Sequence, residues 1–287
     1  MGVVNVTPDS FSDGGLFIEA DAAIAHAREL VAEGAEILDV GGESTRPGAE
    51  PVSVAEELRR VLPVVAGIAT SGMSAIATPG AGAQISIDTS KAAVAAAALD
   101  AGASIVNDVS AFRADPEMAG LVADRGAECC LMHMLGEPRT MQADPRYGDV
   151  VDDVRAFLEE RLAYAVGEGV REQRIMLDPG IGFGKTIAHN LALLRRLDEL
   201  TGIGRPLVVG TSRKSFIGRI LADAAGEESP VAPDRRLAGT IATNVLAYER
   251  GASVFRVHDV APMRDALASA AATLNPRWSP ARRTPTS

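Results

Sequence analysis

An arginine and a histidine two positions apart, Arg256 and His258, close the last apolar segment of the chain. Side chains at positions i and i+2 leave a β-strand on the same side, so both would enter one space. A guanidinium and an imidazole can both donate hydrogen bonds to a single phosphate group. Asn5 ends the first apolar run in a similar way. If the first and last strands are neighbours, these three residues share a pocket that receives a phosphorylated ligand.

Short apolar runs alternate with longer segments of helical pattern. The predicted strands are residues 2–6, 36–40, 84–88, 104–107, 128–133, 175–178, 207–210 and 253–257. The predicted helices are residues 20–33, 53–69, 91–101, 116–125, 150–168, 187–199, 215–224 and 234–250. Repetition of a helix, a Gly-Ala pair and a strand implies a parallel sheet. Eight units favour a single closed (β/α)8 TIM barrel, and an open doubly wound sheet is the less favoured alternative.

Polar residues stand at the ends of nearly all predicted strands. Because TIM-barrel active sites lie at the C-terminal ends of the strands, these residues would gather on one face. They are Asn5, Asp39, Asp88, Asn107, His133, Asp178, Ser212 with Lys214, and Arg256 with His258. Asp and Asn also favour strand ends and helix N-caps, so a structural role suits any single one equally well. For the whole ring, a shared binding site is the stronger interpretation.

Several members of this ring suit a flat heterocycle. Asp88 and Asp178 can accept paired N–H donors, and Asn107 offers both a donor and an acceptor. Lys214 begins a predicted helix, where the helix dipole disfavours a cation, so a ligand role is favoured over a basic helix start. We expect Asp108 to point outward as a structural partner. His133 is interpreted as a barrel-core residue, with contact to a ligand as the less favoured alternative.

Long loops surround the ring. Residues 8–15 and 41–48 exceed the usual length of about 2–6 residues for such connections, and we expect them to be mobile and to close over substrate. Residues 182–185 read either as a phosphate grip or as a turn that presents Phe183 as an apolar wall, and they are too short for a P-loop. Residues 70–83 are expected to form a loose surface connection.

Composition narrows the class of protein. The hydrophobic content of 47% over 287 residues is ample for one large core, and the net charge of −10 argues against nucleic-acid or anionic-membrane partners. Cys129 and Cys130 are adjacent, so no disulfide between them is expected, and a reduced cytoplasmic setting fits. The sequence contains no apolar run long enough to span a membrane and no secretory leader pattern. We predict one barrel over residues 1–274 and a proline-rich, disordered tail over 275–287.

Five longer strings are similar to the signatures of the dihydropteroate synthase family. They are residues 5–15 (NVTPDSFSDGG), 39–48 (DVGGESTRPG), 178–185 (DPGIGFGK), 212–214 (SRK) and 256–259 (RVHD). The resemblance implies a (β/α)8 barrel, usually a homodimer, that joins 6-hydroxymethyl-7,8-dihydropterin diphosphate to 4-aminobenzoate. The products are 7,8-dihydropteroate and pyrophosphate, in folate biosynthesis. Family members usually carry a segment before the first strand, so we expect either an upstream start or a less protected barrel bottom.

The resemblance also implies roles for matching positions. Pterin binding falls to Asp88, Asn107, Asp178 and Lys214. Mg²⁺ and diphosphate binding falls to Asn5, with Arg256 and His258 as anion ligands. Thr45 and Arg46 lie on the second loop, and Pro47, Phe183 and Ser212 shape the aminobenzoate pocket. Asp88, Asp178, Lys214 and Arg256 would be the catalytic residues of a dissociative substitution, in which pyrophosphate leaves before the amine attacks and no enzyme nucleophile is required.

Two other functions remain as alternatives. A pterin-dependent methyltransferase would share the carboxylates but has no need to grip a diphosphate, so Arg256, His258 and the Thr45-Arg46-Pro47 loop argue against it. A non-catalytic pterin-binding paralogue would have lost motif residues, and here the motifs are intact.

Overall fold

The computed structural model describes residues 1–7, 16–45, 48–73, 82–137 and 139–277 of the chain. Eight strands occur within these segments, at the positions that the sequence predicts, although the last two are shorter than predicted. They are β1 (Gly2–Asn5), β2 (Ile37–Gly41), β3 (Gln84–Asp88), β4 (Ile105–Asp108), β5 (Glu128–Met132), β6 (Ile175–Asp178), β7 (Val208–Val209) and β8 (Val254–Phe255).

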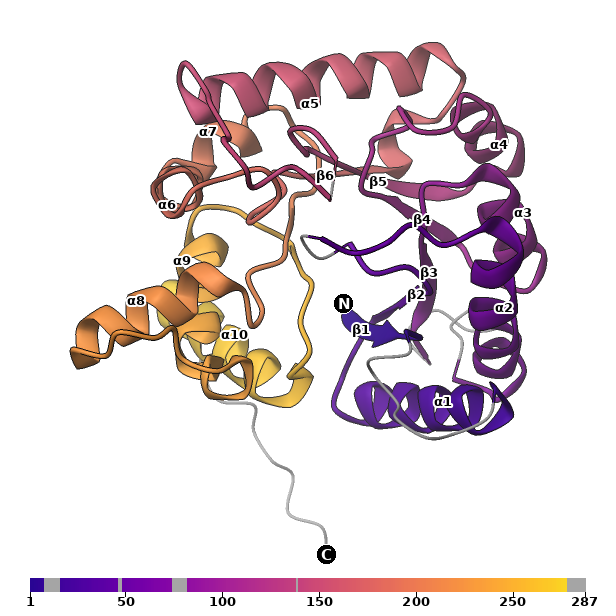
Figure 1. Ribbon diagram of the computed structural model, residues 1–287, viewed down its shortest axis with the longest axis horizontal. Helices are drawn as coiled ribbons and strands as arrows, with labels where there is room; N and C mark the ends of the chain where they lie inside the picture. The colour runs from indigo at the N-terminus through magenta and orange to yellow at the C-terminus, as the bar shows by residue number, and fades with distance from the viewer. Residues whose placement is uncertain (8–15, 46–47, 74–81, 138, 278–287) are drawn as a thin grey trace, which may run out of the picture.

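The strands are parallel, and Figure 1 shows β1 to β6 in chain order. β1 to β6 form one sheet, and β7 pairs with β8 in a second. Single parallel bridges, Leu177 to Leu207 and Gly2 to Val257, join the second sheet to β6 and to β1. The Val3 amide also donates to the Val257 carbonyl at 3.1 Å. The first and last strands are therefore neighbours, and the predicted (β/α)8 architecture is confirmed.

Helices cover the outside of the ring. They are α1 (Leu16–Ala32), α2 (Val54–Thr70), α3 (Ala92–Asp100), α4 (Met118–Arg125), α5 (Val150–Gly167), α6 (Ile187–Arg195), α7 (Leu197–Thr201), α8 (Ser215–Ala225), α9 (Leu237–Glu249) and α10 (Val260–Leu274), with short 3₁₀ turns at Glu172–Arg174 and Pro233–Arg235. In the described part of the chain, no helix is long and apolar enough to cross a membrane.

Two helical segments differ from the prediction. The predicted helix over residues 187–199 is divided at Arg196, whose backbone leaves helical geometry (φ −112°, ψ 30°) and whose guanidinium bonds Asp149 and Glu199. α10 was not predicted. It buries Val260 and Met263 on one side, a weak pattern among its many alanines. The predicted tail over residues 275–287 begins after α10, and most of it lies outside the described residues.

Local signals set the boundaries of the repeated units. Asp149 caps α5 by accepting the amides of Val151 and Asp152 at 2.8 and 3.1 Å, which satisfies donors that the helix leaves unpaired. Gly126 ends α4 with a φ of 57°, a left-handed conformation that disfavours other residues. The chain then turns directly into the next strand. These units place every strand's carboxyl end on the same face of the ring.

Two parts of the hydrophobic core lie one on each side of the strands, and a third cluster, of Val109, Met132, Met134 and Met141, packs against Phe183. The larger part packs the helices onto the outside of the ring. The smaller part lies inside and contains Ile105, Cys130, Met176 and Val208, each from a different strand. Cys129 belongs to the outer part, so the two adjacent cysteines point to opposite faces, as predicted, and both are free. This inner apolar cluster supports the polar residues at the carboxyl ends of the strands.

Candidate active site

The carboxyl ends of four strands carry one connected cluster of polar side chains. Arg256, which follows β8, donates from Nε to Asp39 Oδ2 at 2.6 Å and from Nη2 to Asp88 Oδ2 at 2.9 Å. Asn107 donates from Nδ2 to Asp39 Oδ2 at 3.1 Å. The structure therefore brings together three predicted site residues, Asp88, Asn107 and Arg256, around a fourth side chain.

That fourth side chain, Asp39, is the centre of the cluster. It is completely buried, and Ser86 donates its hydroxyl to Asp39 Oδ1 at 2.6 Å. Sequence reasoning placed Asp39 in the ring of strand ends but gave it no role toward a ligand. The available signal was a carboxylate inside an apolar strand, because a buried charge needs compensating partners from elsewhere in the fold.

Burial and neighbouring charges shift the pKa values of two members of the cluster. Burial, together with the charge of Asp39, raises the pKa of Asp88 to about 7, although Arg256 opposes the change. Burial also lowers the pKa of Arg256, but the Asp39 and Asp88 carboxylates outweigh this effect and hold that pKa above its ordinary value. Arg256 is thus a fixed cation beside a carboxyl group that can gain or lose a proton near neutral pH.

A second group of predicted site residues lies after β6 and β7. Asp178 Oδ1 accepts the Gly180 amide at 2.7 Å, and burial raises the pKa of Asp178 while Lys214 opposes it. Lys214 donates from Nζ to the Ile181 carbonyl and lies 4.6 Å from the centroid of the Phe183 ring. Burial lowers the pKa of Lys214 to about 8, and Asp178 opposes this change. The two loops therefore meet at the Lys214 ammonium group.

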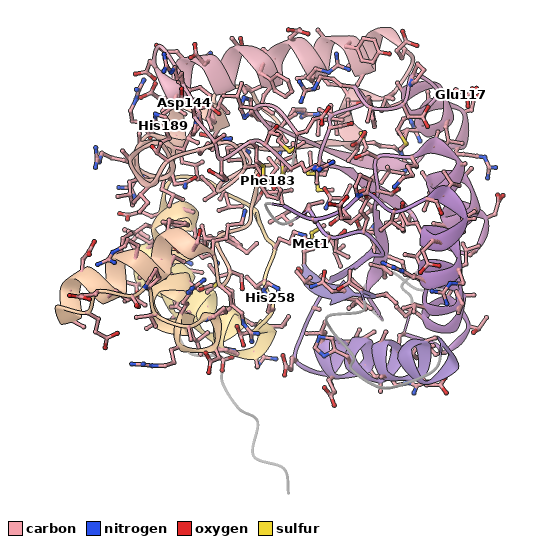
Figure 2. All side chains as sticks on the ribbon, in the orientation of Figure 1. Met1, Glu117, Asp144, Phe183, His189 and His258 are labelled. Atoms are coloured by element: carbon pink, nitrogen blue, oxygen red, sulfur yellow. The ribbon has the colours of Figure 1, made fainter. Side chains whose placement is uncertain are left out.

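The segment over residues 182–185 forms a turn. The Phe183 amide donates to the Gly180 carbonyl at 3.0 Å, and Figure 2 shows Phe183 toward the middle of the molecule. Lys185 points into the protein, where its Nζ lies 2.8 Å from His133 Nδ1 and donates to the Phe183 carbonyl at 3.0 Å. Of the two sequence interpretations, the turn that presents Phe183 agrees with this geometry, since Lys185 is almost fully buried and occupied.

His133 and Asp108 have the structural surroundings that we expected. Burial, followed by the electrostatic effect of Lys185, lowers the pKa of His133 to about 2, so its imidazole is neutral. Asp108 is fully buried and accepts the amides of Ser110 and Phe112 at 2.7 and 2.9 Å. Both residues shape the loops near the site without joining the Arg256 cluster.

His258, the other residue predicted to bind an anion, contacts Ser212, which is predicted to line the aminobenzoate pocket. Ser212 Oγ lies 2.9 Å from His258 Nδ1 and accepts the His258 amide at 3.2 Å. Next to this pair, Arg213 donates to both carboxylate oxygens of Asp259 at 3.0 and 2.6 Å. This fork holds Arg213 at a φ of 59°, which costs strain for a side-chain-bearing residue. The loops after β7 and β8 are therefore fixed against each other.

The protein side chains suit a magnesium ion that is coordinated mainly by substrate phosphates and waters. Strand register places Asn5 in one layer with Asp88, since Asn5 pairs with Gly41 and Gly41 with Asp88. Among the described residues, no group of three or more His, Cys, Asp or Glu side chains could hold a metal. Mg²⁺ commonly takes one or two protein oxygens and completes its shell with substrate phosphates and waters. The Asn5 amide oxygen, in the layer of Asp88, would supply one such protein oxygen.

Some predicted residues cannot be placed. Thr45 is half-buried at the start of the second loop. Arg46 and Pro47, and the whole of residues 8–15, lie outside the described residues, so the predicted mobility of these loops stays a prediction. Residues 74–81, within the predicted loose connection, also lie outside them.

The chain resembles known proteins over almost its whole length. A family profile described as "Pterin binding enzyme" matches residues 1–258. The chain belongs to the pterin-binding enzyme family. The dihydropteroate synthase of Mycobacterium leprae (strain TN) is 48% identical over 269 residues, which cover 93% of this chain and 90% of that protein. The dihydropteroate synthase of Escherichia coli (strain K12) is 44% identical over 275 residues, which cover 96% and 91%.

Solved structures of the pterin-binding enzyme family share this fold. A Yersinia pestis dihydropteroate synthase in complex with a sulfonamide drug has a TM-score of 0.85 at 42% identity, covering 95% of this chain and 93% of that one. A Xanthomonas albilineans dihydropteroate synthase with 4-aminobenzoic acid has a TM-score of 0.83 at 45% identity, covering 95% and 92%. The family resemblance expected from the five sequence strings is confirmed.

Proposed function

We propose that this chain is a dihydropteroate synthase. It is a transferase that joins 6-hydroxymethyl-7,8-dihydropterin diphosphate to 4-aminobenzoate and releases pyrophosphate. The observation that carries the proposal is the single cluster in which Arg256 joins Asp39 to Asp88 while Asn107 bonds Asp39. Hydrogen-bonding groups for a heterocycle and a cation for a phosphate thus lie within one bonded network.

The carboxylates and the amide recognise the pterin. Asp88 and Asp178 accept N–H donors of the ring, and Asn107 supplies a donor and an acceptor. Asp39 orients the other groups, because it holds both Arg256 and Asn107 through one oxygen. Ligand donors stabilise the ionised form of Asp88, whose pKa is about 7 in the unliganded chain. Pterin binding therefore completes the ionisation of this carboxyl group.

Arg256 and His258 bind the diphosphate, and Lys214 holds the pterin. A magnesium ion held by Asn5 and the diphosphate would supply further neutralisation of the leaving group. The bond between the pterin methylene carbon and the diphosphate oxygen breaks, and the oxygen keeps the electron pair. Asp88 and Asp178, beside the pterin, favour the positive charge that remains on its methylene group. The bound cations favour the departing anion, so the two groups of residues act at opposite ends of the breaking bond.

The second substrate enters beside Phe183 and Ser212. The Phe183 ring supplies an apolar wall, and Ser212 contacts His258, one of the two proposed anion ligands. Thr45, Arg46 and Pro47 are proposed to complete this pocket from the second loop. The amine nitrogen forms the new bond to the methylene carbon and then loses a proton. No side chain forms a covalent bond to substrate, so the mechanism needs no nucleophilic residue.

A coupled pyrophosphate-release assay tests this function against its alternatives. The purified protein should release pyrophosphate only when pterin diphosphate and 4-aminobenzoate are both present. A methyltransferase would instead transfer the methyl group of methyltetrahydrofolate, and a binding paralogue would retain pterin without releasing pyrophosphate. Either of these results would replace the proposed function. A sulfonamide should compete with 4-aminobenzoate and leave pterin binding intact.

The proposal includes a cytoplasmic homodimer. Three exposed apolar side chains, Ile220, Leu246 and Leu274, lie on the neighbouring helices α8, α9 and α10. In the proposed dimer, a second copy would cover exposed apolar side chains on these helices. Light scattering should give twice the chain mass for the wild type, and Leu246→Glu should shift the protein toward the monomer. A wild type that is monomeric at micromolar concentration would contradict the dimer.

A further inference from the structure

A partly buried lysine outside the pterin cluster connects the second loop to helix α2. Lys91, the N-cap residue of α3, forms ion pairs with Glu43 in the loop after β2 and with Glu57 of α2, the latter at 2.6 Å. The Glu57 side chain is completely buried, and the Lys91 and Glu43 side chains are only 24% and 27% exposed. Ion pairs with this little solvent are screened far less than surface pairs.

Glu43 connects the two ends of the second loop. While Oε2 contacts Lys91, Oε1 accepts the Val52 amide at 3.1 Å, so one carboxylate joins two positions that are nine residues apart. Arg60 donates to the Gly42 carbonyl at 2.9 Å. A side chain at Gly42 would meet Val61 at 2.7 Å, which shows that the loop lies directly on α2. The base of the loop is thus fixed at its start and at its end, with Thr45 between.

Lys91 is the cation that makes this arrangement stable. It brings two carboxylates to one ammonium group, and without it Glu43 and Glu57 would repel each other. Within the described part of the chain, Glu57 Oε1 has no hydrogen-bond partner, so the Lys91 contact to Oε2 carries the compensation for burying this charge. Burial lowers the pKa of Lys91, but the two carboxylates outweigh it and raise that pKa above its ordinary value.

We propose that Lys91 is a positioning residue for the aminobenzoate half of the reaction. It fixes Glu43, and through Glu43 the base of the loop that carries Thr45. This inference rests on the proposed function. The pterin cluster holds itself together through Asp39, Asp88, Asn107 and Arg256 without a hydrogen bond from Lys91. Loss of the Lys91 charge therefore acts first on the loop that meets 4-aminobenzoate, because Glu57 influences the pKa of Asp88 less than burial, Asp39 and Arg256 do.

Steady-state kinetics of Lys91→Met test the selectivity. The methionine keeps most of the volume of the side chain and removes its charge. We expect the KM for 4-aminobenzoate to rise about tenfold, because a small displacement far from the reacting atoms weakens positioning. The KM for the pterin diphosphate should stay within about twofold, and Lys91→Arg should restore most of the loss by keeping a cation that can pair with both carboxylates. An equal rise in both KM values would overturn the proposal.

Hydrogen exchange provides a readout that does not depend on activity. In Lys91→Met, the amides of residues 42–45 and 48–52 should exchange faster than in the wild type. The matched control is Arg125→Met, which removes an ion pair with Asp100 on the outer helices and should leave these amides unchanged. Faster exchange in a protein that makes no dihydropteroate would support the loop anchor and contradict the proposed function. Unchanged exchange in Lys91→Met would overturn the anchor even in an active synthase.

Discussion

Replacing Asp88 with asparagine should stabilise the fold and damage the site, and the size of the stabilisation should depend on pH. In the folded chain, the Asp88 pKa is raised from 3.8 to about 7, mainly by burial. Between these two values, the folded chain keeps a proton that the unfolded chain has lost. The contribution of Asp88 to stability is therefore fully present below its ordinary pKa and is lost as the pH rises through about 7. An asparagine at this position does not ionise, so its contribution to stability does not fall as the pH rises.

The magnitude follows from the shift. Each unit of pKa difference corresponds to about 1.4 kcal/mol, so the full cost of ionising folded Asp88 is about 4 kcal/mol. At pH 5 folded Asp88 is still protonated, whereas Asp88 of the unfolded chain is largely ionised. Only part of the full free-energy cost therefore applies at this pH. The free energy of unfolding of Asp88→Asn, measured relative to the wild type, should therefore be about 2 to 3 kcal/mol more favourable at pH 8 than at pH 5. The Arg256–Asp39 contact remains in both proteins.

Urea denaturation at the two pH values measures this difference. The control is Asp100→Asn, because Arg125 lowers the pKa of Asp100. The contribution of Asp100 is present above its ordinary pKa, so this variant should differ from the wild type equally at pH 5 and pH 8. The same Asp88→Asn protein should bind pterin diphosphate at least about tenfold more weakly, since a charged hydrogen bond is lost. A stability difference for Asp88→Asn that is constant, or larger at pH 5, would refute the electrostatic account.

Two further predictions concern binding. Lys214→Ala should lower kcat/KM for the pterin diphosphate by about 10- to 150-fold, the equivalent of about 1.5–3 kcal/mol for a charged contact, with an unchanged melting temperature. In the wild type, pterin affinity should fall as the pH rises past the Lys214 pKa of about 8. Near-normal turnover of the Lys214→Ala variant would exclude the role assigned to Lys214. In calorimetry, 4-aminobenzoate and sulfonamides should bind weakly alone and more tightly with pyrophosphate and Mg²⁺ present, because the sites are coupled. Equal affinity in both conditions would argue against that coupling.

The parts of the site that could be predicted from the sequence depend on short continuous segments of the chain. Strand ends follow from short apolar runs, and the TIM-barrel rule then places Asp88, Asn107, Asp178 and Arg256 on one face. The meeting of the first and last strands needed only the assumption that the ring closes, which the Gly2–Val257 bridge supports. The five family strings added residue roles that spacing alone could not supply.

The parts that sequence did not predict depend on contacts between distant segments. Asp39 became central because Ser86, Asn107 and Arg256 converge on it from three other strands. The Lys91 network is likewise formed by three separate elements, so each residue alone resembles an ordinary surface charge. α10 was missed because alanines blur the difference between its two faces, and the break at Arg196 depends on partners on α5 and α7.

Product formation by the wild type and by Arg256→Met tests the central claim most directly. Single-turnover reactions with both substrates and Mg²⁺ would be followed by mass spectrometry of the pterin product. The control is Arg250→Met, because Arg250 is the C-cap residue of α9 and donates to the Arg195 and Leu246 carbonyls. We predict one dihydropteroate for each pyrophosphate released by the wild type and by the control. Arg256→Met should be at least about a hundredfold slower, as when one preorganised donor to a developing charge is removed. An Arg256→Met protein that forms dihydropteroate at the wild-type rate would contradict the claim that the Asp39–Arg256–Asp88 cluster performs the reaction.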